Sequence, residues 1–302
     1  MAYEVVGVGH AAVDYLGVVP RYPEADAKIE LEEFSLQGGG PVATALVMLS
    51  TLGIETAFAG VVSDDDFGMF IRQGLREAGV DTSGLVVAPG QVSPMSFIAV
   101  ERGSGRRTIF YTRGDVPPMS PQQLPLDRIA AARVLHVDGL QMEAQIAAAR
   151  HARENGVTVV YDAGSPRPGM DELIAATDVL VASERFAAEV GGGALAESLK
   201  ALRARGPNSV VITIGEDGSV GMEDGETYIL PAIPIEAVDT TGAGDVYHGA
   251  FIYGLLQGWD LRERMRFANA AAGLKCRVLG GRAGIPERAQ IQQALDGRLS
   301  AP

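Results

Sequence analysis

The sequence predicts a doubly wound α/β fold with a small additional β-sheet, and three features of the chain indicate it. Short apolar runs typical of buried strands alternate with longer helical patterns through most of the 302 residues. This alternation is typical of parallel strands that are connected by helical crossovers. Several of the helical patterns end at a glycine, as helix C-termini often do. Two segments instead alternate polar and apolar residues, which is typical of hairpin strands.

The expected core elements follow one another regularly along the chain. Apolar runs predict strands at residues 3–9, 56–62, 134–137, 157–162, 179–182 and 210–214. Helical spacing of apolar residues predicts helices at residues 41–52, 67–78, 142–154, 195–205, 243–257 and 261–274. We therefore expect three layers, in which a mostly parallel central sheet lies between two layers of helices.

The two segments with alternating faces predict hairpins. The expected pairs are residues 13–19 with 28–36, and residues 96–102 with 107–112 through the turn Gly103-Ser104-Gly105. We expect a single domain over residues 1–302, with lid segments at about 12–36 and 94–113 inserted in the α/β core. A sheet inserted in this way would close over a ligand and exclude water from it.

Composition narrows the class of protein. The chain is 47% hydrophobic and 21% charged, with a formal net charge of −13 and a pI near 4.8. An acidic surface argues against nucleic acid or an anionic membrane as a partner. The single cysteine, Cys276, forms no internal disulfide, and the four histidines show no zinc-ligand spacing. Without an export signal or a membrane-length apolar run, we expect a cytoplasmic protein.

The stretch Asp239-Thr240-Thr241-Gly242-Ala243-Gly244-Asp245 comes directly before an amphipathic helix. The first amide groups of a helix have no partner within the helix, so they face back into this loop. Gly242, Ala243 and Gly244 have little side chain to obstruct an anion, and the helix dipole adds about 0.3 to 1 kcal/mol of attraction. The loop therefore predicts a local phosphate site.

Asp245 lies where a bound phosphate would repel it. An aspartate in a first helical turn is also favourable without any ligand, and the stretch can be an ordinary glycine turn. Catalysis explains the carboxylate better, because Asp245 could accept the proton of a substrate hydroxyl as that oxygen attacks a γ-phosphate. The amides of residues 242–244 would stabilise the charge that develops on the phosphoryl group.

Other nucleotide motifs fit less well. Gly7-Val8-Gly9-His10-Ala11-Ala12 matches the dinucleotide fingerprint in its GxGxxA form, but the residues after it are extended in pattern where a helix should begin. A Walker P-loop is absent from the sequence, whose lysines are Lys28, Lys200 and Lys275.

Several further residues have two readings each. Gly38-Gly39-Gly40-Pro41 either makes a turn before a helix or lets backbone amides reach the hydroxyls of a ligand. Asp14 is either a turn residue or a carboxylate that accepts hydrogen bonds from adjacent hydroxyls. Residues 213–218 follow a strand at the edge where α/β folds bind ligands, or form a simple turn. Asp64-Asp65-Asp66 is typical of a helix N-cap, and His248 is typical of a structural histidine.

The stretch 239–245, followed by Gly249-Ala250-Phe251, closely resembles the second signature of the ribokinase (PfkB) family of carbohydrate kinases. The likeness extends over essentially the whole chain: Asp14, the diglycine loop, Gly60 to Asp65 with Phe67-Gly68, Thr213 to Gly218 and Gly280 to Pro286. The resemblance implies a ribokinase-like three-layer fold with a β-sheet lid, often shared across a homodimer. It also implies ATP-dependent phosphorylation of a sugar hydroxyl.

The resemblance assigns roles to individual residues. Asp245 would be the general base, and Gly242, Ala243 and Gly244 the anion hole. Contacts to the sugar would come from Asp14, Gly39, Gly40, Thr44 and Arg113, and contacts to ATP from Ser183, Thr213, Gly215, Gly218 and Asn269. The family often binds a monovalent cation beside the anion hole, and Asp239 with the Thr241 carbonyl occupies the matching positions. Gly284 replaces a frequent serine ligand of that cation, so backbone carbonyls would supply the remaining oxygens.

Two departures from the family pattern concern specificity and metal handling. Thr44 stands where many ribokinases have a sugar-binding asparagine, which argues against a simple ribose kinase. Ser183-Glu184-Arg185-Phe186 stands where the family commonly has Asn-x-x-Glu, whose acidic member helps place magnesium. Phe186 lacks that function, so either Glu184 compensates or ATP oxygens and water hold most of the Mg²⁺.

A branch-level resemblance is also present. Residues 38–41 with Ala43-Thr44-Ala45, His248, residues 272–276 and residues 280–286 resemble the sulfofructose kinase branch. Phe110 and Gly139 stand where that branch would have polar or basic groups for a sulfonate, whereas Arg113 nearby could serve another anion. The acceptor is therefore left open.

The expected function is an ATP-dependent sugar kinase that uses Mg²⁺ and, by resemblance, K⁺. A nucleoside kinase of the same fold is an alternative, for which Tyr15, Phe97 and Phe110 offer aromatic surfaces. A noncatalytic sensor is the alternative from another class, and the missing acid at Phe186 is its only support.

Overall fold

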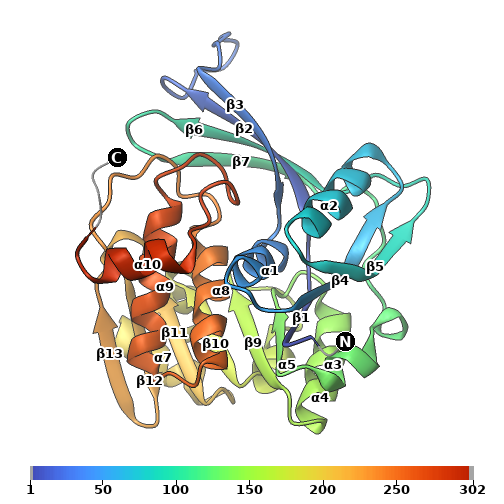
Figure 1. Ribbon diagram of the computed structural model, residues 1–302, viewed down its shortest axis with the longest axis vertical. Helices are drawn as coiled ribbons and strands as arrows, with labels where there is room; N and C mark the ends of the chain where they lie inside the picture. Colours follow the sequence, from blue (N-terminus) through green and yellow to red (C-terminus); the bar gives the residue numbers. More distant parts are fainter. Residues whose placement is uncertain (1–2, 299–302) are drawn as a thin grey trace.

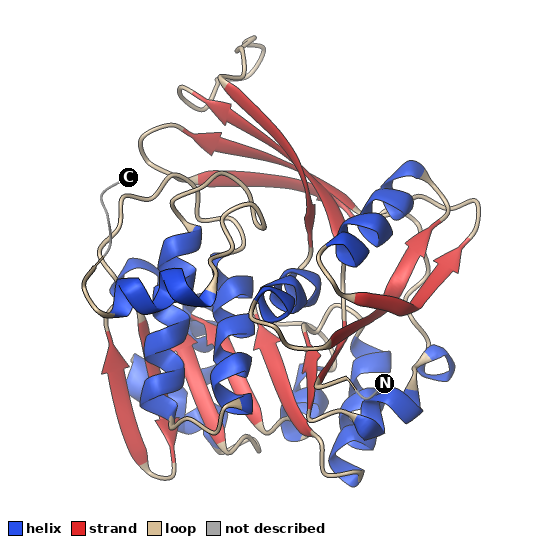
Figure 2. Ribbon diagram, viewed as in Figure 1, coloured by secondary structure: helices blue, strands red, loops and turns tan. Residues whose placement is uncertain are grey.

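The computed structural model describes residues 3–298, and its main sheet has nine strands with helices on both faces (Figures 1 and 2). The strand order of this sheet A is β13-β12-β11-β10-β9-β8-β1-β4-β5. Its parallel strands are β1 Val5–Val8, β4 Thr56–Ser63, β5 Asp81–Ala88, β8 Val134–Val137, β9 Thr158–Ala163, β10 Val179–Ser183 and β11 Ser209–Thr213. The antiparallel strands β12 Ser219–Glu223 and β13 Glu226–Leu230 extend one edge. The predicted mostly parallel three-layer architecture is confirmed.

Alternation along the strands explains why helices cover both faces. Val179 and Val181 of β10 belong to one buried cluster, whereas Leu180 and Ala182 belong to the other. Successive side chains of a strand point to opposite faces, so an almost wholly apolar strand needs cover on both sides. The helices of the first cluster are α1 Pro41–Thr51, α2 Asp66–Glu77, α8 Ala243–Leu256, α9 Leu261–Lys275 and α10 Arg288–Leu295. Those of the second are α3 Leu126–Ala131, α4 Met142–Glu154, α5 Met170–Ala175, α6 Glu184–Phe186 and α7 Leu195–Arg203.

Short irregular turns complete the chain between these elements. They are the 3₁₀ turns Pro121–Gln123 and Gly215–Asp217 and a π-helical turn at Ala187–Gly191. Asp65 is the N-cap of α2, where its carboxylate accepts a hydrogen bond from Gly68 N at 2.8 Å, as expected. Within residues 3–298, no helix is both long and apolar enough to cross a bilayer.

A second sheet projects from one end of the core, at the top of Figure 1. This sheet B has the order β3-β2-β6-β7, formed by β2 Ala12–Val19, β3 Glu33–Gly39, β6 Met95–Glu101 and β7 Arg107–Thr112. Both predicted antiparallel hairpins are present, and a parallel pairing of β2 with β6 joins them. Asp14 and Ser96 are neighbours across that parallel pair.

The predicted bounds of one hairpin strand were wrong. The strand expected at residues 28–36 runs instead from Glu33 to Gly39, and residues 28–32 are not strand. Alternating polarity shows which residues share a face of a strand, but it does not show which of them pair with a neighbouring strand. β2 begins at Ala12, which pairs with Gly39, so β3 must extend to the glycines before α1.

Packing of α8 fixes the position of the loop before it. Gly249 lies against α1, and a Cβ there would come within 2.6 Å of the Ala45 carbonyl oxygen. The close approach of the two helices therefore needs a glycine at this position. α9 packs on the other side of α8, so the first turn of α8 is held between buried neighbours.

Candidate active site

The loop that precedes α8 has a conformation that glycine permits. Gly242 is the N-cap of α8 with a φ of +74°, and a Cβ at this position would lie 2.8 Å from Gly281 Cα. Both the left-handed backbone and the neighbouring chain therefore exclude an ordinary side chain. Asp245 lies in the first turn of α8, as the sequence predicted.

Two cavities meet at this loop. The sheet-B cavity has a volume of about 430 Å³, and its lining includes Asp14, Gly40, Arg113, Thr241, Gly242 and Asp245. The α9 cavity has a volume of about 440 Å³, and its lining includes Thr213, Gly215, Gly218, Thr240, Ala243, Gly244 and Asn269. Loop 239–245 contributes residues to both linings. Three of the predicted sugar residues, Asp14, Gly40 and Arg113, line the sheet-B cavity, whereas Gly39 and Thr44 do not. The predicted nucleotide residues line the α9 cavity with the exception of Ser183.

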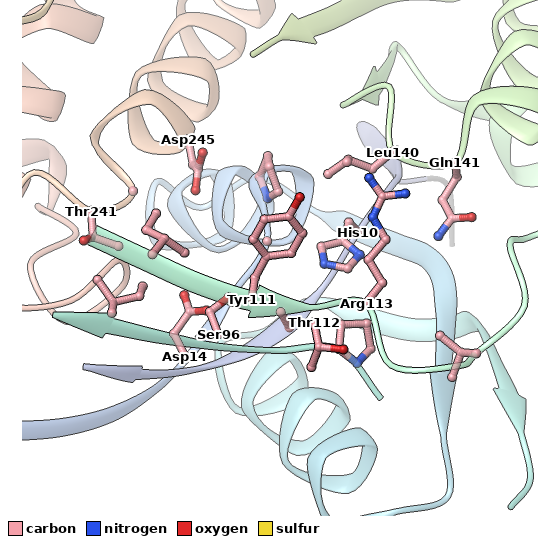
Figure 3. Close-up of a pocket in the computed structure, with 18 of the residues that line it drawn as sticks. His10, Asp14, Ser96, Tyr111, Thr112, Arg113, Leu140, Gln141, Thr241 and Asp245 are labelled. Atoms are coloured by element: carbon pink, nitrogen blue, oxygen red, sulfur yellow. The ribbon is translucent and has the colours of Figure 1, made fainter. Parts of the chain in front are cut away.

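Asp245 faces the sheet-B cavity in an environment that holds its proton tightly (Figure 3). Burial raises the pKa of Asp245 to about 7, and the Asp162 carboxylate adds to the rise. His248 and Arg107 oppose it with favourable charge interactions. A carboxylate with a pKa near neutrality can both accept and release a proton at physiological pH.

His248, which the sequence interpretation left as structural, is fully engaged by the protein. Its Nδ1 lies 2.6 Å from the Gly244 carbonyl oxygen, and its Nε2 lies 3.3 Å from the Val181 carbonyl oxygen. Burial lowers the pKa of the ring. His248 therefore connects the backbone of the loop at Gly244 to strand β10 at Val181.

Asp14 is the second carboxylate of the cavity and comes from β2. Burial raises the pKa of Asp14 to about 6, although a hydrogen bond with Ser96 and the charge of Arg282 lower it. Figure 3 shows Asp14 and Ser96 side by side across the cavity from Asp245. A Cβ at Gly39 would lie 2.0 Å from the Asp14 carboxylate, so any other residue at this position would displace the Asp14 side chain.

Arg282 was not identified from the sequence. Its guanidinium donates to Gly39 O at 2.9 Å and to Thr44 Oγ1 at 3.3 Å. Thr44 is buried and meets Arg282, but it is not among the residues that line the sheet-B cavity. Gly40 does line the cavity, with a φ of +98° and no room for a Cβ against His10 O. The signals for Arg282 were its place between glycines in the closing loop and the resemblance of residues 280–286 to the family, neither of which gave it a role.

Basic residues form another part of the same lining. His10, Arg107, Arg113 and Arg167 all contribute to the sheet-B cavity, although the sequence had indicated only Arg113. Arg107 also reaches the loop before α8, where its Nη1 donates to Thr240 Oγ1 at 2.5 Å. These residues come from segments far apart in the chain, so no local pattern connected them.

Asp239 is completely buried below the loop. Its Oδ1 accepts hydrogen bonds from Thr241 N at 2.9 Å and Thr241 Oγ1 at 2.7 Å, and its Oδ2 accepts one from Gly280 N at 2.8 Å. The ammonium of Lys275 donates to the Asp239 carbonyl oxygen at 2.8 Å. Asp239 therefore ties the loop to α9 and to the closing loop.

Four of the five predicted nucleotide residues line the α9 cavity: Thr213, Gly215, Gly218 and Asn269. Gly218 has a φ of +101°, and a Cβ there would lie 2.1 Å from the Leu230 carbonyl oxygen. Asn269 lines the cavity, but its Nδ2 donates to Leu230 O at 3.1 Å and Pro231 O at 3.2 Å, and its Oδ1 accepts from Ser219. Asn269 therefore shapes the wall of this cavity through contacts within the protein.

Ser183 and Glu184 lie apart from both linings. The Ser183 hydroxyl caps α6 by accepting from Phe186 N at 3.0 Å, and it donates to Gly164 O at 3.0 Å. Glu184 is exposed, and Phe186 is buried against Tyr161. Over residues 3–298, no cluster of three or more histidine, cysteine or acidic side chains is arranged to hold a metal ion.

At the N-terminus of α8, the Ala243 amide donates to Thr240 O at 3.2 Å, whereas the amides of Gly242 and Gly244 have no backbone partner among residues 3–298. A helix N-terminus of this kind, with an aspartate in its first turn and cavities on either side, is typical of a small-molecule phosphotransferase. The model of the pfkB family carbohydrate kinases matches residues 3–288, and the chain belongs to that family. It is therefore a kinase of sugars or nucleosides with a ribokinase-like fold, as the signature around Asp245 predicted.

Individual relatives show the breadth of the family. The chain is 30% identical over 281 residues to the ATP-dependent ribose-1-phosphate kinase of Halopiger xanaduensis, covering 92% of this chain and 93% of that protein. It is 27% identical over 289 residues to the nucleoside kinase of Methanothermobacter thermautotrophicus, covering 94% and 93%. The ribokinase of Arabidopsis thaliana complexed with ribose and ATP has a TM-score of 0.82 at 25% identity, covering 98% of this chain and 99% of that chain.

Proposed function

We propose that this kinase transfers the γ-phosphoryl group of ATP from the α9 cavity to a sugar hydroxyl in the sheet-B cavity. The observation that carries the proposal is the shared loop, because residues 241, 242 and 245 line the sheet-B cavity and residues 240, 243 and 244 line the α9 cavity. A phosphoryl group in transfer between the two cavities would meet the amides of Gly242 and Gly244 at the N-terminus of α8, which have no backbone partner in the described part of the chain. Those amides would stabilise the charge on its equatorial oxygens.

Asp245 would act as the general base. The acceptor oxygen attacks the γ-phosphorus, its proton passes to the Asp245 carboxylate, and the bond to the β,γ-bridging oxygen breaks to release ADP. A pKa near 7 gives Asp245 a substantial ionised fraction at neutral pH while keeping it basic enough to take the proton. Asp14, on the opposite wall, would orient the acceptor by accepting hydrogen bonds from its hydroxyls.

The position of Glu184 bears on the metal. When bound with ATP, Mg²⁺ would neutralise negative charge on the phosphates, and it retains water ligands readily. Because Glu184 is exposed outside both linings, we assign most of the metal's ligands to ATP and water. Asp245→Asn and Glu184→Gln should therefore differ sharply, with the second variant retaining most activity.

Sheet B would act as a lid over the acceptor and as the contact to a second copy. Its face away from the cavity exposes Phe34, Leu36 and Phe110, at 56%, 40% and 52% of their surface. Exposed apolar side chains grouped on one sheet face are typical of an interface. We propose a homodimer through this face, and Phe110→Asp should then convert the dimer to a monomer in light scattering.

A nucleoside acceptor has one specific observation in its favour. Tyr111 lines the sheet-B cavity and is 68% exposed, so it offers a ring on which a base can stack. The aromatic residues that the sequence suggested for this role are placed differently. Tyr15 packs with Phe34, and Phe97 packs with Phe110, on the face of sheet B away from the cavity.

The test is ADP release from MgATP with a panel of ketoses, aldoses, sugar phosphates, sugar acids and nucleosides. Asp245→Asn should lower kcat by about 10²- to 10⁴-fold on the best acceptor, which corresponds to roughly 3 to 5.5 kcal/mol, while the variant remains folded. Near-normal turnover in that variant would overturn the mechanism. ATP and acceptor binding without ADP formation in the unmodified protein would instead indicate a sensor.

A further inference from the structure

The end of the sheet-B cavity away from Asp245 is positively charged. Arg113 follows β7, and Arg167 lies in the loop after β9. Figure 3 shows Arg113 beside His10 and close to Leu140 and Gln141, whereas Asp14, Thr241 and Asp245 lie on the other side. The cavity therefore has an acidic end and a basic end.

The two guanidinium groups line the same cavity, and neither is paired with a carboxylate among residues 3–298. Burial lowers the pKa of His10; the Asp138 carboxylate opposes this, and the charges of Arg113 and Arg167 add to the lowering, so both guanidinium charges act on the ring. Asp138, beside His10, already accepts hydrogen bonds from His10 N, Leu140 N and Gln145 Nε2.

The arginines are poorly explained by the nucleotide. Both arginines line the sheet-B cavity. Within residues 3–298, the one charged side chain that lines the α9 cavity is that of Glu216, which is acidic. Two arginines in one cavity wall are also unusual in this chain, because its formal net charge of −13 makes most of its surface acidic. A cavity with one sign of charge concentrates a ligand of the other sign.

We propose that the acceptor carries an anionic group, a phosphate ester or a carboxylate, which Arg113 and Arg167 bind while the reacting hydroxyl meets Asp245. This inference rests on the proposed function. Guanidinium groups bind such oxyanions through paired N–H donors, so the anion would fix the acceptor's orientation from the end opposite the reacting hydroxyl. The anion itself takes no part in the transfer.

The experiment compares matched acceptors that differ only in charge, for example fructose with its monophosphates and glucose with gluconate. We expect kcat/KM for one charged acceptor to exceed that of its neutral parent by at least about 100-fold. Arg113→Ala should raise KM for that acceptor by about 10- to 100-fold and change kcat, the KM for ATP and turnover of the neutral parent little. Arg106→Ala is the matched control, because Arg106 is exposed in the turn before β7 and outside the cavity lining.

The outcomes separate this inference from the proposed function. Equal kcat/KM for charged and neutral acceptors, unchanged in Arg113→Ala, would overturn the anionic acceptor and leave the kinase intact. If no acceptor yields ADP, calorimetric titration with the same pairs decides the subsite. Charged-acceptor binding that is lost in Arg113→Ala supports it, and binding that ignores charge rejects it.

A second inference rests on a separate observation, a lysine buried behind the anion-hole loop. Lys275 is the last residue of α9 and is 0% exposed. Its ammonium donates to the Asp239 carbonyl oxygen at 2.8 Å. Burial lowers the pKa of Lys275, and the Asp239 carboxylate is the foremost charge that opposes this. A buried charge of this kind persists only with polar partners.

These residues do not fit a separate monovalent cation. Both Asp239 carboxylate oxygens accept hydrogen bonds from Thr241 and Gly280, and Lys275 takes its carbonyl oxygen. A Cβ at Gly284 would lie 2.6 Å from the Lys275 carbonyl oxygen, so a serine ligand has no room at that position. Both oxygens of the expected Asp239 carboxylate ligand and the Asp239 carbonyl oxygen therefore already accept hydrogen bonds from the protein's own donors.

We infer that the Lys275 ammonium replaces the monovalent cation behind the loop, which makes this kinase independent of K⁺. The inference rests on the proposed function and names Lys275 as a positioning residue. Its fixed charge and its hydrogen bond hold Asp239, and through Asp239 they hold the loop whose amides would meet the phosphoryl group. An ammonium group and K⁺ share one positive charge and an affinity for carbonyl oxygens.

The test begins with the unmodified enzyme in potassium, sodium and tetramethylammonium buffers, where we expect rates within about twofold. Lys275→Ala should lose at least about 10-fold in kcat and regain part of it with K⁺, NH₄⁺ or methylamine. Lys200→Ala is the control, because Lys200 is exposed on α7. Without nucleotide, K⁺ should also raise the unfolding temperature of Lys275→Ala more than tetramethylammonium does.

Two results would reject the inference. One is activation of the unmodified enzyme by K⁺ of about 10-fold or more, which decides the question even if the variant does not fold. The other is a Lys275→Ala variant that keeps full activity in tetramethylammonium. If no acceptor yields ADP, the unfolding temperature of Lys275→Ala still tests the inference. A larger rise with K⁺ than with tetramethylammonium supports the replacement of the cation by Lys275, and equal responses reject it.

Discussion

The two walls of the sheet-B cavity are built in opposite ways. On one side, α8 is buried over most of its length between α1 and α9, and Asp245 projects from its first turn. On the other side, every residue of β7 is exposed, and the strand pairs only with β6 at the edge of sheet B. The proposed chemistry is on the wall that packing holds rigid, and the proposed acceptor contacts of Arg113 are on the wall with few buried neighbours.

This contrast has a physical reason. A general base must stay within hydrogen-bond distance of its proton, and an error of about 1 Å can cost about 10²-fold in rate. A lid must instead open for substrate and close over it, so it belongs to the less stable parts of a protein. The difference between the walls predicts different responses to matched substitutions.

The largest difference should appear in stability. Phe251→Ala removes a wholly buried ring from α8 and should cost about 3 to 5 kcal/mol of unfolding free energy. Phe110→Ala removes a half-exposed ring from β7 and should change it by no more than about 0.5 kcal/mol. Chemical denaturation at a concentration where the chain is monomeric measures both. Equal losses at the two positions would break the comparison.

Glycine substitution tests the walls through the backbone. Gly242→Ala should cost about 1 to 3 kcal/mol and lower kcat about 10-fold or more, because φ is +74° and the Cβ would lie 2.8 Å from Gly281 Cα. Gly103→Ala, in the turn before β7, has a similar φ of +80° but open space around its Cβ. Gly103→Ala should lower the free energy of unfolding by at most about 1 kcal/mol, the cost of a positive φ at alanine, and it should keep its activity. A fully active Gly242→Ala would show that the loop tolerates displacement.

The pH dependence of kcat/KM should report a carboxylate from each wall. Asp245, with a pKa of about 7, and Asp14, with a pKa of about 6, must both be ionised in this mechanism. Activity should therefore fall about tenfold per pH unit below 7 and more steeply below 6. Asp14→Asn should lower kcat/KM at every pH, but its kcat/KM should fall only about tenfold per pH unit, also below pH 6. An unchanged steep limb in that variant would remove Asp14 from the ionisation scheme.

The smallest expected effect lies at the contact between the walls. Arg107 donates from β7 to Thr240, and its charge lowers the pKa of Asp245. Arg107→Ala should move the acid limb upward by less than one pH unit, because the contact is exposed and such charge interactions are typically worth below about 1 kcal/mol. The same profile in Arg106→Ala should stay in place. A downward shift in Arg107→Ala would contradict this electrostatic assignment.

Local pattern predicted the elements that are strongly periodic and missed those that are not. The predicted β7 matches residue by residue, and the β6–β7 turn was read from its glycines. The strands β5, β12 and β13 and the helices α3, α5 and α10 were not anticipated. Most of these are short or lie at a sheet edge, where partial exposure weakens the hydrophobic pattern.

The candidate site was predicted unevenly for the same reason. Loop 239–245 and Asp245 form one contiguous motif, so the sequence displayed them together. Ser183 and Glu184 were carried over by alignment with a family pattern, and the fold places them outside both cavities. Lys275 and Arg282 lie in the stretches 272–276 and 280–286, which resemble a branch of the family but do not indicate a role for either residue, and Arg167 lies in no motif.

The sequence by itself determined the α/β class, the glycine loop before α8 and the carboxylate in its first turn. These depend on interactions between residues a few positions apart, which a local pattern records. The tertiary structure alone decided that the loop lies between two cavities, that Arg113 and Arg167 line one of them, and that Lys275 meets Asp239. Those contacts join residues dozens of positions apart, and only the packing of helices on the sheet brings them within reach of one another.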